Sequence, residues 1–296
     1  MEKRRRYKTV TGKLIEQLID DKKAKAKMST IKGNLCLTAQ LRQFIGGNFE
    51  KQPIDEALCR DFAAFLLEKL KPSTVREYLQ QLAAILAEAE RNGIIAKSPM
   101  PEITPLLPER EMAERVYLTK EELTQLSAAP CPHESTRQAF LFSCYTGLVL
   151  ADIETLQWDN IHHSGTGLVL VKKQVKSGIE VKVPLCKMAE NILKTQETEY
   201  NGLPVGQQDG KVFHLLGRAT LSIDLNTWAE TAQLNKHITF LVGRHTFATL
   251  AITAGVDLYE VSKWCGHASV QATQVYARML QKQHNSSIHA FDNMFA

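Results

Sequence analysis

The sequence predicts a mainly α-helical protein with one small antiparallel β-sheet, divided into two domains. Three observations support this prediction. Apolar residues recur at helical spacing in four segments of the first hundred residues. Four prolines then fall within ten residues, at positions 99, 101, 105 and 108, and no continuous helix tolerates them. Beyond them, helical patterns resume around a single stretch, 167–185, that alternates like two paired strands.

The first hundred residues are expected to form a small bundle of four helices with short connections. The patterns predict helices over 13–27, 35–49, 54–70 and from Pro72 to Gly93. In the last of these, Thr74 and Glu77 fit a capping box, and Gly93 is a natural stop. The sequence therefore predicts a helical domain over 1–100, a linker over 101–117 and a second domain over 118–296.

The second domain is predicted to mix helices with a β-hairpin. Thr119 and Glu122 fit a capping box that opens its first helix. Within 167–185, the apolar positions alternate on both sides of a polar turn in which Gly178 supplies positive φ. Gly255 and Gly266 are natural helix stops. The helices are expected over 119–128, 135–146, 151–158, 186–199, 219–233, 242–254, 257–264 and 269–281.

Composition narrows the class of protein. Of 296 residues, 44% are hydrophobic and 23% charged, the ordinary balance of a soluble globular chain. No apolar run approaches the roughly 18 residues of a membrane span, and no secretory signal follows the basic N-terminus. The six cysteines include no Cys-x-x-Cys pair, so neither a disulfide framework nor a zinc site is expected. This usage favours a reducing, cytoplasmic compartment.

Positive charge is concentrated at the start of the chain. Residues 1–32 hold eleven Lys or Arg against four acids, a net +7, so the rest of the chain carries −3 of the total +4. A basic arm on a near-neutral body suits a polyanionic partner, because each cation placed near a phosphate releases a counterion. A solvated lysine-rich helix face accounts for the same charges equally well.

Three C-terminal segments carry residues suited to phosphate chemistry. They are 243–249, with Arg244 near the start of a helix, 265–267, with His267 after a glycine, and 273–277, with Tyr276 inside a helix. An arginine fork near free helix N–H groups suits a phosphate. A tyrosine can attack a phosphodiester where cations hold the phosphate. Taken singly, a helical tyrosine is more often a core residue, and only the spacing raises the odds.

That spacing resembles the tyrosine recombinase, or phage integrase, family. The family signature is His-x-x-Arg-His-Thr-Phe-Ala-Thr, then Leu-Gly-His, then a tyrosine nine residues later; here Arg244 precedes His267 by 23 residues and Tyr276 follows it by nine. Lys176-Ser-Gly followed by 181–185 is similar to the family's β-hairpin, and 145–148 with 151–158 resembles the helix pair around its first catalytic arginine. The resemblance implies an N-terminal core-binding, SAM-like helical domain and a C-terminal mixed α/β catalytic domain of the DNA breaking-rejoining type.

The resemblance also implies roles for four residues. Tyr276 would be the nucleophile, leaving a 3′-phosphotyrosine and a free 5′-hydroxyl, and Arg244 would hold a non-bridging phosphate oxygen. Lys176 would protonate the leaving 5′-oxygen, and His267 would hydrogen-bond the phosphate. No metal, cofactor or small-molecule substrate is implied. The partners implied are double-stranded DNA and three further copies of the chain, in a tetramer on two DNA sites.

Two positions depart from the family pattern. Val149 stands where the family has its first catalytic arginine, and Leu241 where it has a histidine, and neither side chain can contact a phosphate productively. A missing transition-state donor costs on the order of 10² to 10³ in rate. Arg218, His214 and His237 are the sequence's candidates for a replacement.

Several hypotheses about the function therefore stay open. The first is a site-specific recombinase or integrase of a mobile element, active or weakened, and the second is a recombinase-like DNA-binding or accessory protein that transfers no strands. A type IB topoisomerase and a helical scaffold without DNA are minor alternatives. Residues 286–295 carry apolar side chains near helical spacing, which suits docking on a neighbouring subunit or packing on their own domain.

Overall fold

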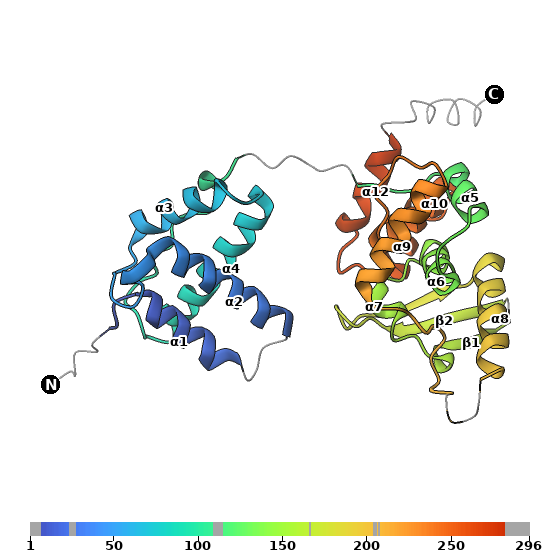
Figure 1. Cartoon of the computed structure of the whole chain (residues 1–296), viewed down its shortest axis with the longest axis horizontal. Helices are drawn as coiled ribbons and strands as arrows, with labels where there is room; N and C mark the ends of the chain where they lie inside the picture. Colours follow the sequence, from blue (N-terminus) through green and yellow to red (C-terminus); the bar gives the residue numbers. More distant parts are fainter. Residues whose placement is uncertain are drawn as a thin grey trace. The chain divides into compact units, whose positions relative to one another are not determined.

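The computed structural model describes residues 7–23, 28–108, 115–165, 167–203, 206 and 208–281. The chain divides into two compact units, Met1–Met112 and Ala113–Ala296, each around its own hydrophobic core (Figure 1). The predicted class, mainly helical with a small antiparallel sheet, is confirmed. Within the described residues, no helix combines the length and the apolarity that crossing a membrane requires.

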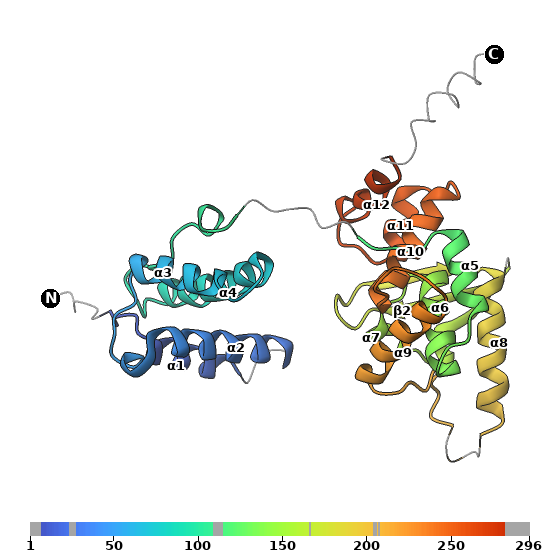
Figure 2. The same ribbon diagram turned by 45° about the horizontal axis from the view of Figure 1, so that its top comes forward.

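The first unit is built from four helices. In Figure 2, α1 (Gly12–Lys23) and α2 (Met28–Ile45) lie side by side, and α3 (Glu56–Leu67) lies with α4 (Pro72–Arg91) in a second layer. Short 3-10 turns at Gly46–Asn48 and Thr104–Leu106 complete the unit. The apolar faces predicted from the sequence meet between the layers, where Phe62, Leu66, Leu79 and Leu82 are fully buried.

Two details of this unit differ from the prediction. Helix α2 begins at Met28 instead of residue 35 and runs through Gly33, where an added Cβ would meet the Gln81 side chain of α4 at 3.1 Å. The capping box at Thr74 is wrong, because α4 begins two residues earlier, at Pro72. Proline suits the first helical position, since its φ is already helical and the N–H that it lacks would have no intrahelical partner there.

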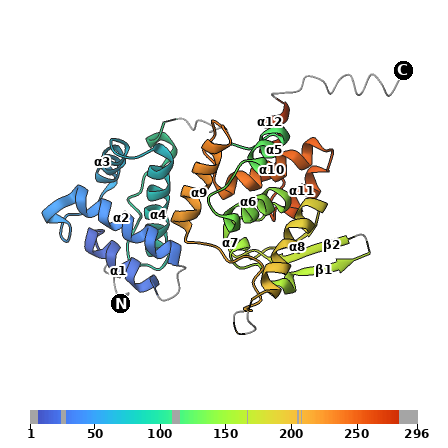
Figure 3. The ribbon, with the colours of Figure 1, turned by 45° about the vertical axis from the view of Figure 1, so that its right-hand side comes forward.

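The second unit packs helices against a three-stranded sheet. Helices α5 (Lys120–Ala128), α6 (Glu134–Thr146) and α7 (Leu150–Ile153) precede the sheet, and α8 (Lys187–Asn201), α9 (Arg218–Thr231), α10 (Phe240–Thr253), α11 (Leu258–Trp264) and α12 (Gln271–Gln281) follow it. The antiparallel sheet has the order β1 (Ile161–Ser164), β2 (Gly167–Lys173), β3 (Glu180–Pro184). Figure 3 shows the sheet with α8 at one side of this unit.

Helix α6 is the centre of the second unit, and most of its residues are buried. It packs closely on α10, because Gly243 has no side chain: a Cβ there would lie 2.6 Å from the Ser143 Oγ. Helix α6 ends at Gly147, whose φ of +73° turns the chain into α7. This turn brings the start of α7 under the side chains of α10.

The structure confirms the capping box of Thr119 and Glu122, the β2–β3 hairpin and the turn at Gly178, with φ of +72°. The predicted helix over 151–158 is wrong. Helix α7 is a single turn, because Gln157 pairs with Lys211 as an isolated bridge and the Trp158 N–H donates to the Gly210 carbonyl. Strand β1 was not predicted, since three of its four residues are exposed and give no alternating pattern.

Candidate active site

The side chain of Tyr276 lies at the meeting point of three segments of the second unit. It projects from α12, is only 1% exposed, and packs between two histidine rings. The ring of His267, from the turn between α11 and α12, lies nearly parallel to it at 6.3 Å between centroids, and that of His245 on α10 lies at 5.6 Å. The structure thus brings the predicted pair Tyr276 and His267 together.

An arginine that the sequence analysis placed in the linker also reaches this tyrosine. The Arg115 Nη1 donates to the Tyr276 phenolic oxygen at 3.2 Å, and the guanidinium carbon lies 5.3 Å from the centre of the ring. The sequence offered only one feature that could have pointed to Arg115, its place shortly before the capping box at Thr119. No motif separates it from the other basic residues of the chain.

Arg244 presents a buried guanidinium whose hydrogen-bonding capacity is only partly used. Its side chain is 12% exposed and its Nε donates to the Gly147 carbonyl at 2.6 Å. Its Nη2 lies 3.9 Å from the Asp152 Oδ2, beyond hydrogen-bond distance, and both atoms are buried without a hydrogen-bond partner. The other oxygen of Asp152 accepts from the Val175 N–H at 2.8 Å. A buried N–H group without an acceptor is costly, and an anionic ligand would satisfy it.

The two histidines of the site are harder to protonate than a histidine in water. Burial first, then the charges of Arg244, Arg115 and His245, lower the pKa of His267 to about 4. Burial also lowers the pKa of His245, whose Nδ1 donates to the Val116 carbonyl at 3.0 Å. Both imidazoles are therefore neutral at neutral pH. The Nδ1 of His267 is within 2.7 Å of the Thr273 Oγ1, so its Nε2 remains for a ligand.

The acidity of Tyr276 depends on two opposing effects. Burial raises the pKa of its phenol above 10, whereas the charge and the hydrogen bond of Arg115, with the charge of Arg244, act to lower it. The pKa stays raised on balance, so the phenol is neutral in the free protein, and the two guanidinium groups offset only part of the cost of burying its anion.

Lys176 lies apart from these residues. It is exposed in the turn between β2 and β3, and among the described residues no hydrogen bond or ion pair joins it to the site. The base of the turn is anchored at the site, because the Gln174 Nε2 donates to the Cys265 carbonyl at 3.0 Å and the Ser177 Oγ donates to the Gln174 Oε1 at 2.8 Å. The hairpin thus holds Lys176 on a short turn whose first residues contact the segment before His267.

The two departures from the family pattern are also near this region in the chain. Val149 is half-buried and forms the N-cap of α7, two residues after the carbonyl that receives Arg244. Leu241 lies in the first turn of α10 and is 53% exposed. Both positions hold apolar side chains.

None of the three replacements considered from the sequence contacts Tyr276. Arg218 forms a two-pronged ion pair with Glu154, at 2.8 and 2.6 Å, and the His214 Nε2 is 3.1 Å from the Asp209 Oδ1. His237 is exposed. Among the described residues, no group of three or more His, Cys, Asp or Glu side chains could hold a metal ion.

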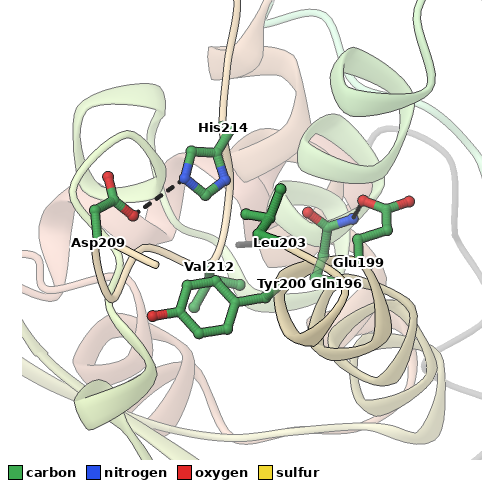
Figure 4. Close-up of a pocket in the computed structure, with 7 residues that line it drawn as sticks. All are labelled: Gln196, Glu199, Tyr200, Leu203, Asp209, Val212 and His214. Atoms are coloured by element: carbon green, nitrogen blue, oxygen red, sulfur yellow. Dashed lines mark hydrogen bonds and ion pairs between the residues drawn. The ribbon is translucent and has the colours of Figure 1, made fainter. Parts of the chain in front are cut away.

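A pocket lies elsewhere in this unit. It is formed by residues of α8 and of the segment 203–214, and His214 and Asp209 meet at one of its walls (Figure 4). Neither Tyr276 nor the arginines that adjoin it line this pocket, so it is separate from the candidate site.

Each unit of the chain matches a model of a known protein family. The model of the phage integrase family matches residues 116–283, and that of the phage integrase SAM-like domain matches 12–105. The tyrosine recombinase XerC of Oceanobacillus iheyensis is 28% identical over 225 residues, 72% of each chain. The putative defective protein IntQ of Escherichia coli K12 is 21% identical over 251 residues, 73% of this chain and 62% of IntQ.

Solved structures share the fold. The Tn1549 transposon integrase, in complex with circular intermediate DNA, superposes with a TM-score of 0.71 at 18% identity, over 88% of this chain and 94% of that chain. The XerH site-specific recombinase, bound to a palindromic difH substrate in a post-cleavage complex, gives a TM-score of 0.71 at 17% identity, over 92% and 82%. On the match of both family models, which together span most of the chain, this protein belongs to the phage integrase family.

Proposed function

We propose that this protein is a site-specific DNA strand transferase of the tyrosine recombinase type, with Tyr276 as its nucleophile. The observation that carries the proposal is the surroundings of that phenol: it is buried, contacts one guanidinium, and lies between two neutral imidazoles near a second, partly unpaired guanidinium. Relatives named as tyrosine recombinases, and structural neighbours solved with DNA, support the same chemistry.

In the proposed reaction, the phenolic oxygen of Tyr276 attacks the phosphorus of one phosphodiester, and the bond from phosphorus to the 5′-oxygen breaks. The phenol releases its proton to solvent and Lys176 delivers one to the leaving 5′-oxygen, so the proton count balances. The products are a 3′-phosphotyrosine and a 5′-hydroxyl. Rejoining is the reverse attack by another 5′-hydroxyl, and no water or high-energy cofactor is consumed.

Three side chains would stabilise the charge that develops on the phosphate. Arg244 offers the N–H that lacks a partner in the free protein, and a preorganised donor of this kind acts without reorganisation during the reaction. His267 is neutral, so it contributes a hydrogen bond and no charge. Lys176, on its exposed turn, would approach the leaving group only once DNA lies over the site.

A covalent-complex assay tests the proposal. Duplexes from the DNA flanking the protein's own gene, and duplexes selected from a random pool by binding, are incubated with the full-length chain. The products are then run on a denaturing gel. We expect a shifted band that is absent with Tyr276→Phe, which removes only the nucleophilic oxygen. A band of equal intensity with Tyr276→Phe would refute the assignment.

Val149 and Leu241 favour a second candidate, a recombinase-like protein that binds DNA without cutting it. The two candidates differ in one result. A strand transferase gives the covalent band with its natural sequence, whereas a binding protein shifts the duplex in a native gel and gives the covalent band only as Val149→Arg/Leu241→His.

The proposed partner is double-stranded DNA, bound largely through phosphates by a tetramer on two sites. If so, affinity falls steeply between about 50 and 200 mM salt, because each neutralised phosphate releases a counterion. A flat salt response contradicts extensive phosphate contact.

All six cysteines are free thiols, which suits a reaction in the cytoplasm. The tail 284–296, outside the described residues, is the segment to delete in testing tetramer assembly on DNA.

A further inference from the structure

We propose that Arg115 is a catalytic residue of this centre, a second guanidinium that binds the scissile phosphate in place of the arginine that position 149 lacks. The inference rests on the proposed function and deepens it, since it assigns the missing cation to a segment that lies outside the family's signature motifs. Among the described residues, Arg115 and Arg244 are the arginines whose charges act on Tyr276.

The chemical need is plain. Attack by a phenol places negative charge on the non-bridging oxygens of the phosphate, and such sites commonly surround those oxygens with fixed cations or N–H donors. Arg244 is one such group, but Val149 can donate nothing. A site with a single guanidinium would leave part of that charge without a cationic partner.

Arg115 meets the geometric requirement. Its Nη1 is 3.2 Å from the phenolic oxygen of Tyr276, the atom that becomes bonded to phosphorus. The non-bridging oxygens lie one bond beyond that phosphorus. A guanidinium that contacts the phenolic oxygen in the free protein is therefore within reach of those oxygens in the ester, with only a rotation of its own side chain.

The backbone that carries Arg115 is anchored at the site. The Val116 carbonyl accepts from the Nδ1 of His245 at 3.0 Å, and the Leu118 N–H donates to the Thr246 Oγ1 at 2.9 Å. These two partners directly follow Arg244 in α10. Arg244 and the segment that carries Arg115 are therefore both fixed on the same turn of α10. Such anchoring keeps the distance between two phosphate-binding groups constant.

The charge of Arg115 already acts on its neighbours in the free protein. It lowers the pKa of Tyr276 against the effect of burial, and it lowers the pKa of His267 and of His245. A guanidinium that favours the phenolate also favours the phosphate charge that replaces it. The alternative role is structural, with Arg115 serving only to pack against the tyrosine ring.

The test separates these roles through the charge of the substrate. On a duplex that the wild type cleaves, with the scissile position mapped, the rate of covalent complex formation is measured for wild type, Arg115→Gln, Arg115→Lys and Arg137→Gln. Arg137 is the matched control, a half-buried arginine of the same unit bonded to Glu134 and to the Ser127 carbonyl. The same variants are then measured with a methylphosphonate at the scissile position, which removes the non-bridging negative charge.

We expect Arg115→Gln to slow the phosphodiester reaction about 100-fold or more, with Arg115→Lys in between and Arg137→Gln unchanged. On the methylphosphonate, the deficit of Arg115→Gln should shrink at least tenfold, because there is less charge to stabilise. An equal deficit on both substrates, or none on either, overturns the inference and leaves the proposed function standing. No covalent band with wild type on either substrate, for any selected duplex, overturns both.

Discussion

The imidazole of His267 lies nearly parallel to the phenol of Tyr276, with 11° between the ring planes and 6.3 Å between the centroids. The two side chains are stacked and not hydrogen-bonded to each other. This arrangement removes His267 as an acceptor for the phenolic proton and leaves its Nε2 for another partner. It also buries the imidazole beside two guanidinium groups, which determines how it titrates.

The first prediction concerns pH. The pKa of His267 is about 4 in the folded protein against an ordinary 6.5, so the unfolded chain binds this proton first as pH falls. The stability contributed by the neutral form is fully present above pH 6.5 and is lost as pH falls toward 4. The loss between pH 7.5 and 5 should be up to about 2 kcal/mol.

Tryptophan fluorescence in urea measures this change, because all three tryptophans, at 158, 228 and 264, lie in the second unit. His267→Gln serves as the control and should lose less stability than wild type over the same pH range. Identical losses in the two proteins would mean that His267 is not the group responsible.

The second prediction concerns the buried pair of Arg244 and Asp152. Arg244→Met removes the cation that lies 3.9 Å from the buried Asp152 carboxylate, whose Oδ2 already accepts no hydrogen bond, so the negative charge is left without its counter-charge. Breaking a buried pair in this way costs about 3 kcal/mol of unfolding free energy. Adding Asp152→Asn removes the stranded charge while its oxygen still accepts from Val175, so the double variant should recover at least 1 kcal/mol. Simple additivity of the two substitutions in urea unfolding would show that the pair is not coupled.

A third prediction tests the close packing of α6 on α10. In Gly243→Ala, the new Cβ would lie 2.6 Å from the Ser143 Oγ and 2.9 Å from its Cβ, so the helices must separate. Such overpacking typically costs 1 to 3 kcal/mol, about what we expect here from tryptophan-detected urea unfolding. Gly217→Ala is the control, since nothing lies within 4 Å of a Cβ at that position. Equal stabilities for the two variants would contradict the packing.

The proximity of Tyr276 and His267 could be predicted because both belong to spaced motifs. Arg244, His267 and Tyr276 lie on consecutive C-terminal helices and turns, and their spacing carried the family resemblance. The contact of Arg115 with Tyr276 spans 161 residues and follows no periodic pattern. Tertiary contacts of Val116 and Leu118 with α10 place Arg115 near the phenol, and sequence periodicity carries no information about such contacts.

In the fold, too, elements set by local patterns were predicted and elements set by long-range contacts were not. Helices with a wide apolar face were predicted to within a few residues, because burial and helix period agree there. Residues 154–158 were wrongly predicted as helix, since Gln157 pairs with Lys211 fifty-four positions later in the chain, and β1 was not predicted because most of its residues are exposed. Long-range backbone pairing overrode a local helical preference, as tertiary context often does.

The fourth prediction concerns the two apolar departures. Leu241 is 53% exposed in the first turn of α10, so Leu241→His should change the unfolding free energy by less than about 0.5 kcal/mol. Val149→Arg introduces an arginine two residues after Gly147, whose carbonyl accepts from Arg244. Because position 149 is only half-buried, the new side chain can extend to the surface of the site.

We therefore expect Val149→Arg/Leu241→His to form the covalent complex at least tenfold faster than wild type. The gain from Val149→Arg should be larger in an Arg115→Gln background than in wild type, because the two arginines would serve the same phosphate oxygens and their effects would not add. The denaturing gel measures both rates, with Leu241→His alone as the control. Equal gains in the two backgrounds would mean that the residues act on different groups, and that position 149 needs no substitute from Arg115.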